Sequence, residues 1–227
     1  MSMNPIVLVT GANGALGTAV CKEFCLNNWS VYAVVRSNHD VDHLRDIGVK
    51  EVITADLTDQ DSLLNSLHSL HLLHAVIHCA GGINAGRAIE ETGIDAYTDM
   101  MNRNVLSTFA VMQCTIPKLK TEGGTFISVA AQSVILPATN KAVYSASKAA
   151  VVALTQGLAE EGRPFGVRAH TIIPGILRTA ANLEWASNGE SDSWIEPSDV
   201  AKTMVTLCSP QSKHITGLLV PMISSVG

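Results

Sequence analysis

The chain has 227 residues, of which 47% are hydrophobic and 15% are charged, and its formal net charge is −5. This balance fits a protein with a well-buried core and excludes a disordered chain, while the acidic charge leaves no basic surface for a nucleic acid. No apolar run approaches the ~20 residues of a membrane span, and residues 1–5 lack the basic start of a signal peptide.

Short runs rich in Val and Ile alternate with segments of helical length. The expected strands lie at 6–10, 31–35, 51–54, 75–79, 125–129 and 168–173, with a further apolar stretch at 217–220. The expected helices lie at 14–27, 40–47, 59–70, 95–118, 143–160 and 198–208. Alternation of this kind predicts a parallel sheet of about seven strands with helices on both faces. We therefore expect one doubly wound α/β domain that spans residues 1–227.

A glycine-rich turn follows the first expected strand. Gly11, Gly14 and Gly17 repeat at intervals of three between that strand and the first helix. Glycine allows a tight turn and a close approach to a pyrophosphate, and the N-terminus of the following helix favours negative charge. At the start of a strand–helix–strand unit, this spacing predicts a dinucleotide site.

The end of the second strand bears on which dinucleotide is bound. An acidic residue there would bind the ribose 2′-hydroxyl of NAD, whereas this strand ends at Val35 and is followed by Arg36. Because a guanidinium can pair with a 2′-phosphate, we expect NADP(H) to be preferred, with NAD(H) as the alternative.

Tyr144 and Lys148 lie four residues apart in an expected helix and so share one face of it. An ammonium beside a phenol favours the phenolate and lowers the phenol pKa toward the working pH. The pair is suited to donate a proton to a carbonyl oxygen during reduction.

These motifs resemble those of the short-chain dehydrogenase/reductase family, and the resemblance covers nearly the whole chain. Further matching stretches are Asp56-Leu57, His78–Gly81, Asn104, Pro174-Gly175 with Thr179, Glu196–Ala201 and Ile215–Gly217. The resemblance implies a Rossmann fold and oxidoreductase activity. It places cofactor contacts at Gly11, Asn13, Gly14, Ala15, Leu16, Gly17, Asp56, Leu57, Ala80, Gly81, Tyr144, Lys148, Pro174, Gly175, Ile176 and Thr179.

The resemblance also implies a role for each catalytic position. Tyr144 would donate the proton, and Lys148 would hold the ribose hydroxyls and lower the phenol pKa. Asn104 would hold a water that links Lys148 to solvent. Thr179 and the backbone at Ile176 would bind the nicotinamide carboxamide, and Asp56 would contact the adenine.

One position departs from the family pattern. A serine normally stands thirteen residues before the tyrosine and polarises the substrate carbonyl, but this chain has Ala131 there. Gln132 or Ser133 would replace it through a shifted loop, or the substrate needs no such donor, or turnover is weak. The family's dihydropteridine reductases, which reduce a quinonoid pterin, also carry alanine there, and they share the Gly-Ala-Leu-Gly end of the cofactor loop.

Several other residues invite interpretation. Of four histidines, those at 68 and 71 lie near an expected helix end and those at 74 and 78 at the two ends of a strand, so they need not converge and we expect no metal site. The five cysteines lack zinc-ligand spacing, which predicts reduced thiols in a cytoplasmic protein. Trp185 lies in a short expected lid, where it would line the pocket or anchor the loop. A short lid favours a small or planar substrate.

The sequence thus predicts an NADP(H)-dependent oxidoreductase that acts on a small carbonyl or hydroxyl compound, with Tyr144 as the general acid or base. Two alternatives are a dihydropteridine-reductase-like activity and a nucleotide-sensing regulator with little turnover. The long helices 95–118 and 143–160 have apolar faces that predict a homodimer or homotetramer.

Overall fold

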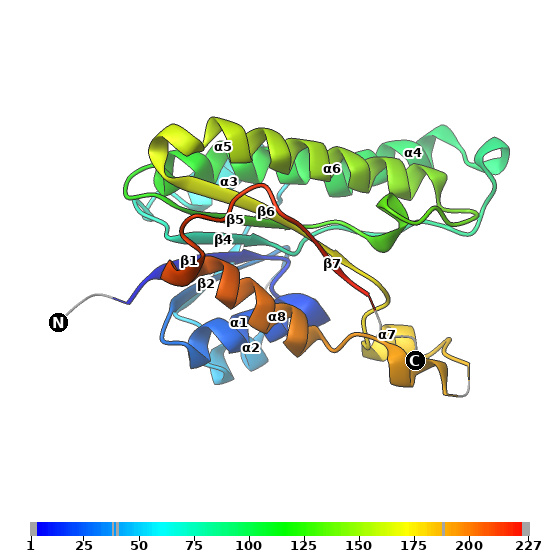
Figure 1. Cartoon of the computed structure of the whole chain (residues 1–227), viewed down its shortest axis with the longest axis horizontal. Coiled ribbons are helices and arrows are strands. Elements are labelled where there is room, and N and C mark those ends of the chain that lie inside the picture. Colours follow the sequence, from blue (N-terminus) through cyan, green and yellow to red (C-terminus); the bar gives the residue numbers. More distant parts are fainter. Residues whose placement is uncertain (1–3, 38, 40, 188, 224–227) are drawn as a thin grey trace.

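Seven parallel strands form one sheet in the order β3-β2-β1-β4-β5-β6-β7 (Figure 1). The computed structural model describes residues 4–37, 39, 41–187 and 189–223. The strands are β1 (Ile6–Thr10), β2 (Ser30–Val35), β3 (Glu51–Thr54), β4 (Ala75–His78), β5 (Gly124–Val129), β6 (Val167–Pro174) and β7 (Leu219–Met222). This order confirms the doubly wound parallel sheet, because the chain moves outward from β1 to one edge and then from β4 to the other.

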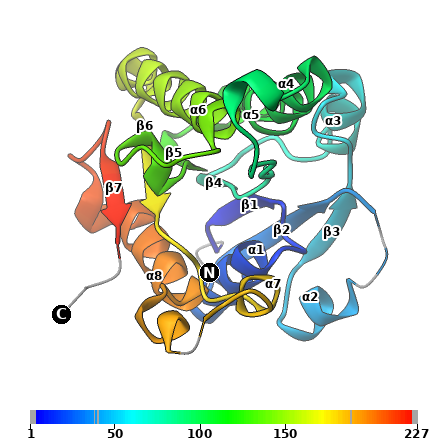
Figure 2. The same ribbon diagram turned by 90° about the vertical axis from the view of Figure 1, so that its right-hand side faces the viewer.

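Helices cover both faces of the sheet, as the two views in Figures 1 and 2 show. One face carries α1 (Ala15–Leu26), α2 (Asp42–Asp46) and α8 (Pro197–Cys208). The other face carries α3 (Gln60–Ser66), α4 (Ile94–Met100), α5 (Ser107–Leu119) and α6 (Ala142–Glu161), and the short helix α7 (Ala180–Leu183) lies beyond the end of β6. The α/β layers expected from the alternating pattern are therefore present.

The central strands are apolar at every position because both of their faces are buried. In β1, Val7 and Val9 belong to the core under α1 and α8, while Leu8 between them belongs to the core under α3 and α5. All three side chains are fully buried. Such burial explains why the strand reads as a continuous apolar run rather than as an alternating one.

The structure differs from the predicted elements at four places. The expected helix 95–118 is interrupted by a π-helical segment, Met101–Leu106, between α4 and α5. The last strand begins at Leu219, two residues later than expected, and α7 was not predicted. The expected helix 40–47 is seen as Asp42–Asp46, and its first expected residue, Asp40, lies outside the described residues.

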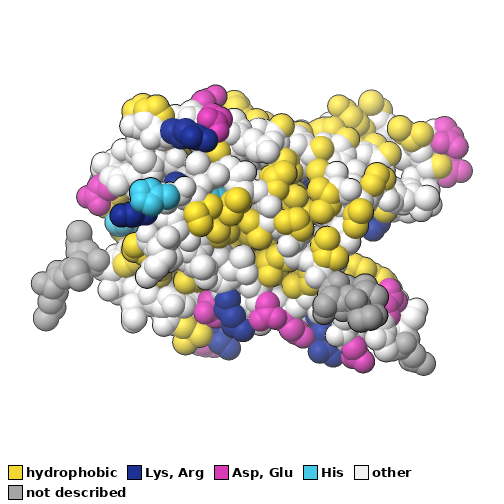
Figure 3. Space-filling view, viewed as in Figure 1, with side chains coloured by type: hydrophobic (Ala, Val, Ile, Leu, Met, Phe, Trp, Pro, Cys, Tyr) yellow, Lys and Arg dark blue, Asp and Glu magenta, His cyan; other side chains and the backbone are white. Residues whose placement is uncertain are grey.

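An apolar area covers the outer edge of the sheet. In Figure 3 hydrophobic side chains gather over β7 and the neighbouring part of α6. Leu218 and Leu219 are both 38% exposed there, and Pro221 lies within β7, where an edge strand tolerates proline. Among the residues described, no helix is both long and apolar enough to cross a membrane.

Candidate active site

Two cavities meet at the edge where the parallel strands end. The larger, about 720 Å³, is lined by residues that follow β1, β2, β3 and β4, among them Gly11, Arg36 and Asp56. The smaller, about 430 Å³, is lined by residues that follow β5 and β6 and by the first turns of α6. Cys79 and Gly81 line both, so the cavities form one groove along the carboxyl edge, where ligands of open α/β sheets bind.

The glycine-rich turn forms one wall of the larger cavity. Gly11 has a φ of +67°, and a Cβ there would lie 2.7 Å from the backbone nitrogen of Ala80, so a larger residue would push β1 and β4 apart. Gly14 is the N-cap of α1, which has no side-chain cap and no acidic residue in its first turn. The positive end of α1 therefore remains available to a phosphate group, which supports a dinucleotide in this cavity.

The far end of the larger cavity combines a cation and an oriented carboxylate. Two hydrogen bonds from Thr58, from its N–H at 2.9 Å and its hydroxyl at 2.7 Å, lower the pKa of Asp56, and the charge of Arg36 contributes less. Arg36 is exposed and makes no ion pair within the described part of the chain. It therefore has a free guanidinium beside the space that an adenosine would fill.

The smaller cavity contains the tyrosine and lysine of α6. Lys148 is 6% exposed, and its ammonium donates to the carbonyl of Val129 at 2.9 Å. Gly81, with a φ of +155°, lies against it, since a Cβ there would be 3.0 Å from Lys148 Nζ and 2.7 Å from Asn104 Oδ1. Only glycine leaves space for both groups, which explains the glycine at the junction of the two cavities.

Burial controls the ionisation of this pair. Burial lowers the pKa of Lys148 to about 8 and raises the pKa of Tyr144 to about 12. The pKa of Tyr144 is thus raised in the structure described, because the phenolate loses hydration on burial, and the expected lowering by Lys148 stays a prediction. Burial and the charge of Lys148 also lower the pKa of His78 to about 3.

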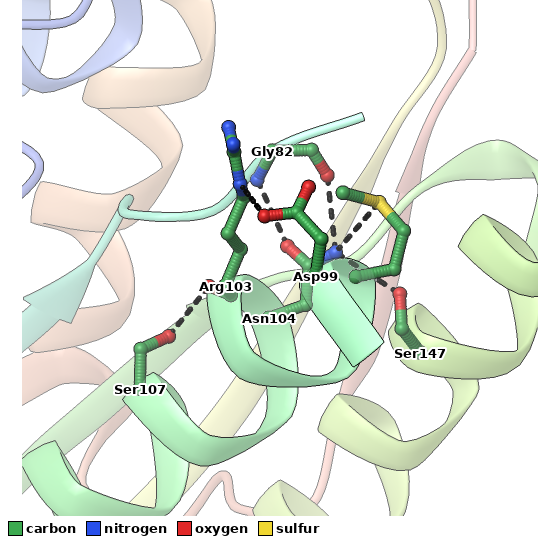
Figure 4. A network of polar contacts seen from close by, with 7 residues as sticks. Gly82, Asp99, Arg103, Asn104, Ser107 and Ser147 are labelled. Carbon is green, nitrogen blue, oxygen red and sulfur yellow. Dashed lines mark hydrogen bonds and ion pairs between the residues drawn. The ribbon is translucent and has the colours of Figure 1, made fainter. Parts of the chain in front are cut away.

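Asn104 lies on the π-helical segment and fastens the loop after β4 (Figure 4). Its Oδ1 accepts from the N–H of Gly82 at 3.0 Å, and its Nδ2 donates to the Gly82 carbonyl and to Ser147 Oγ, each at 3.0 Å. Ser147 in turn donates to the carbonyl of Tyr144 at 2.7 Å. The side chain of Asn104 thus holds the cavity junction and α6 together, while its expected hold on a water stays a prediction.

Arg103, the neighbour of Asn104, faces the larger cavity. Its Nε donates to Asp99 at 2.6 Å, and its Cδ would lie 3.1 Å from a Cβ on Gly82 (Figure 4). Both Asp99 and Arg103 line the larger cavity. Two adjacent residues of the π-helical segment thus have different positions. Arg103 lines the larger cavity, and Asn104 lies beside Gly81 and Lys148.

The segment after β5 has alanine at the position of the family's serine, but it carries another hydroxyl two residues later, on Ser133. Ala131 is 9% exposed and lines the smaller cavity together with Gln132 and Ser133. Gln132 reaches toward the loop after β6, since its Oε1 would be 3.2 Å from a Cβ on Gly175. Ser133 Oγ is buried and has no hydrogen-bond partner in the described part of the chain.

One of two packed tryptophans lines the smaller cavity. Trp185 is 56% exposed and lines it, and its ring centroid lies 4.9 Å from that of Trp194, which is 8% exposed. Trp185 thus lines the cavity and packs on the buried ring of Trp194, while its contact with a substrate stays a prediction. Thr179 Oγ accepts from the N–H of Asn182 at 3.2 Å and so caps α7.

Most of the predicted site residues lie along the groove. The larger cavity is lined by Gly11, Asn13, Gly14, Arg36, Asp56, Leu57, Ala80 and Gly81. The smaller is lined by Leu16, Gly81, Gln132, Ser133, Tyr144, Lys148, Pro174, Gly175, Ile176, Thr179 and Trp185. Ala15, Gly17 and Asn104 line neither cavity.

Sequence reasoning missed Arg103, Ser147 and Lys141, which also belong to this region. Ser147 and Lys141 each stand three residues from Tyr144, and this spacing on one helix face is the signal that could have found them. Arg103 carries no such signal, because its direction depends on the π-helical turn.

Of the histidines and cysteines, Cys79 lines the groove, whereas His78 and Cys21 are buried in the core. His78 Nδ1 is 2.7 Å from the hydroxyl of Thr10, and Cys21 is buried under α1, where burial raises its pKa. In the part of the chain that the structure describes, no group of three or more metal-binding side chains is present.

Comparison with known proteins agrees with this geometry, which defines a dinucleotide-binding protein of the oxidoreductase class. The dihydropteridine reductase of Dictyostelium discoideum is 29% identical over 209 residues, 89% of this chain and 87% of that protein. The structure of ElxO with NADP bound has a TM-score of 0.88 at 21% identity, covering 96% of this chain and 97% of that one. The structure of NAD+-bound xylitol dehydrogenase has a TM-score of 0.89 at 18% identity, covering 99% of this chain and 100% of that one.

The family model described as short chain dehydrogenase matches residues 5–189. The chain therefore belongs to the short-chain dehydrogenase family, and it is an NAD(P)-dependent oxidoreductase by class.

The buried lysine predicts a pH-dependent effect on stability. A lysine pKa lowered from 10.5 to about 8 means that the folded state binds fewer protons than the unfolded state between these pH values. Below pH 8 the buried charge of Lys148 lowers the free energy of unfolding. This free energy is regained as the pH rises from 8 toward 10.5, because the folded protein has already lost the proton. The free energy of unfolding of wild type should rise by about 2–3 kcal/mol relative to Lys148→Met between pH 7 and pH 10, measured in urea.

Lys148→Arg is the matched control, because a guanidinium stays charged throughout this range and its burial is not relieved at pH 10. A constant difference between wild type and Lys148→Met at both pH values would contradict the lowered pKa.

Proposed function

We propose that the chain transfers hydride between NADP(H) and a small carbonyl or hydroxyl compound, with Tyr144 as the proton donor or acceptor. The observation that carries the proposal is the continuous groove, which joins the glycine-rich turn at one end to Tyr144 and Lys148 at the other. The NADP-bound and NAD+-bound proteins of the same fold support a nicotinamide cofactor.

The residues fit such a cofactor at both ends of the groove. The uncapped N-terminus of α1 at Gly14 would hold the pyrophosphate, Asp56 the adenine edge, and Lys148 a ribose hydroxyl. The bound nicotinamide supplies or accepts the hydride. Tyr144, whose pKa is about 12, keeps its proton at neutral pH and so is ready to donate it to a substrate oxygen.

The substrate oxygen needs a second donor if it is an isolated ketone. We propose Ser133 for this task, because its buried hydroxyl has no partner in the described part of the chain and it lines the cavity. A rotation of its side chain toward a carbonyl oxygen would satisfy a donor whose burial without a partner costs free energy.

Ala131 also favours a second candidate function, reduction of a quinonoid dihydropterin. A conjugated ring accepts hydride without an isolated ketone, and the similarity to a dihydropteridine reductase supports this candidate. Trp185 and the apolar wall of the smaller cavity suit a planar ring.

We propose a preference for NADP(H) over NAD(H). Arg36 stands where the groove passes the end of β2, and no carboxylate stands at that strand end. A guanidinium forms strong, charge-assisted hydrogen bonds with a phosphate, which only the 2′-phosphorylated cofactor offers at this point.

We also propose that the chain forms a homodimer or homotetramer through α4, α5 and α6. Leu106 at the end of the π-helical segment and Phe109 in the first turn of α5 are 41% and 45% exposed, and Tyr97 on α4 is 44% exposed. Large apolar side chains gathered on neighbouring helices mark an interaction surface.

The reaction is tested with NADPH, a panel of small ketones and aldehydes, and a quinonoid dihydropterin. Tyr144→Phe should lower kcat by about 10²–10⁴, because general acid catalysis is lost, without weakening NADPH binding. Tyr97→Phe, at an exposed tyrosine on α4, is the control. Ser133→Ala should lower kcat for ketones by about 10–10³ but spare the dihydropterin.

Full activity of Tyr144→Phe would remove Tyr144 as the acid. NADPH binding without turnover of any panel member would instead favour the nucleotide-sensing alternative.

Arg36→Asp should reduce the ratio of kcat/KM with NADPH to that with NADH by about a hundredfold or more. The substitution removes a hydrogen-bonded cation and places a carboxylate beside the 2′-phosphate. Arg163→Asp makes the same change in net charge at the amino edge of the sheet and should leave the ratio unchanged. An unchanged ratio for Arg36→Asp would contradict the preference.

Sedimentation equilibrium should find two or four copies of the 24.0 kDa chain. Phe109→Glu should weaken the association because it would bury a charge between copies, whereas Phe165→Glu, at an exposed phenylalanine after α6, should not. A monomer at micromolar concentration would refute the proposed surface.

A further inference from the structure

The charges around the substrate end of the groove differ from those of the whole chain. The chain carries a net charge of −5, yet the described residues that line the smaller cavity include two lysines, Lys141 and Lys148, and no Asp or Glu. Lys148 is engaged by the carbonyl of Val129 and has its task at the cofactor. Lys141 has no comparable task in the proposed reaction.

Lys141 stands between the smaller cavity and a third one. The third cavity, of about 270 Å³, is lined by Asn84, Arg87, Thr92 and Asn140 as well as Lys141, and again by no described carboxylate. Neither Lys141 nor Arg87 forms an ion pair within the described residues. Two cations without an ion-paired carboxylate among the described residues thus border a polar cavity that has Lys141 in common with the substrate cavity.

The backbone holds Lys141 at a fixed place relative to Tyr144. The carbonyl of Lys141 accepts from the N–H of Ser145 at 2.8 Å, so the helical ladder of α6 already begins at this residue. Lys141 is therefore one turn before Tyr144, with a separation of about 5–6 Å between Cβ atoms. The first turn of α6 contains no acidic residue, so nothing in it neutralises the ammonium.

A second contact fixes the wall around Lys141. The N–H of Gly86 donates to the carbonyl of Asn140 at 2.9 Å, which ties the loop after β4 to the residue before Lys141. Asn140 has a φ of +58°, a conformation that asparagine tolerates better than most residues. The backbone therefore fixes the wall of the third cavity beside Lys141.

We propose that Lys141 selects substrates that carry an anionic group, a carboxylate or a phosphate, close to the reacting carbonyl. The apolar wall and Trp185 would take the body of the substrate, Tyr144 its oxygen, and Lys141 its anion, with Arg87 in the adjoining cavity as a second cation. This inference rests on the proposed carbonyl reduction and names the substrate class for it.

Binding is tested first, without turnover. The protein, with and without NADPH, is titrated with benzoate, phenyl phosphate and the neutral benzamide, and binding is followed by tryptophan fluorescence and calorimetry. The anions should bind about ten- to a hundredfold tighter than the amide, as charge-assisted hydrogen bonds predict. Lys141→Met should abolish this difference and Lys141→Arg should restore most of it. Lys213→Met, at an exposed lysine near the amino ends of the strands, is the control.

Turnover is tested with phenylglyoxylate and its methyl ester, which share the reacting carbonyl and differ in the charge. Wild type should favour the acid through a lower KM, and Lys141→Met should reduce the acid-to-ester ratio of kcat/KM about tenfold or more. Equal binding of anion and amide, or a preference that survives Lys141→Met, would overturn the anion site even if both carbonyls are reduced. Conversely, a preference for benzoate that depends on Lys141, without reduction of any carbonyl, would sustain the anion site and refute the proposed reaction.

Discussion

The burial of one ammonium group organises the active edge of this protein. Lys148 loses most of its hydration, and the structure compensates with the carbonyl of Val129 at the end of β5. Gly81 must lack a side chain to admit it, and Asn104 must hold the loop that carries Gly81 and Gly82. A cation with so little hydration is unfavourable by itself. It persists because strand end, loop and helix are arranged around it.

The fold was largely predictable from the sequence. Runs such as Val7–Val9 are apolar at every position because a parallel sheet is covered on both faces, and few alternative folds would bury such short runs completely. The π-helical segment Met101–Leu106 was not predictable, because a wider turn has no composition of its own. The start of β7 was misplaced by two residues, since an edge strand is only partly buried and its pattern is weak.

The site was predictable where spacing along the chain carries the geometry. Tyr144 and Lys148 follow from a helical interval, and the turn at Gly11 from a strand–helix junction. The pKa of Tyr144 was not predictable, because hydration depends on atoms from several elements, which no local pattern encodes. The placement of Arg103 likewise depends on how loops meet at the strand ends, whereas Ser133 was expected near the substrate and lines the smaller cavity.

The π-helical segment also rotates the faces of α5 about the helix axis relative to those of α4. A residue added to a helical turn shifts the phase of everything that follows by about 100°. Because of this offset, α4 can turn one face to α6 while α5 still buries Val111, Cys114 and Thr115 against the sheet. Losing a single residue within Met101–Leu106 would therefore misalign a whole helix rather than remove one contact, so the length of this short stretch is as constrained as the identity of any residue in it.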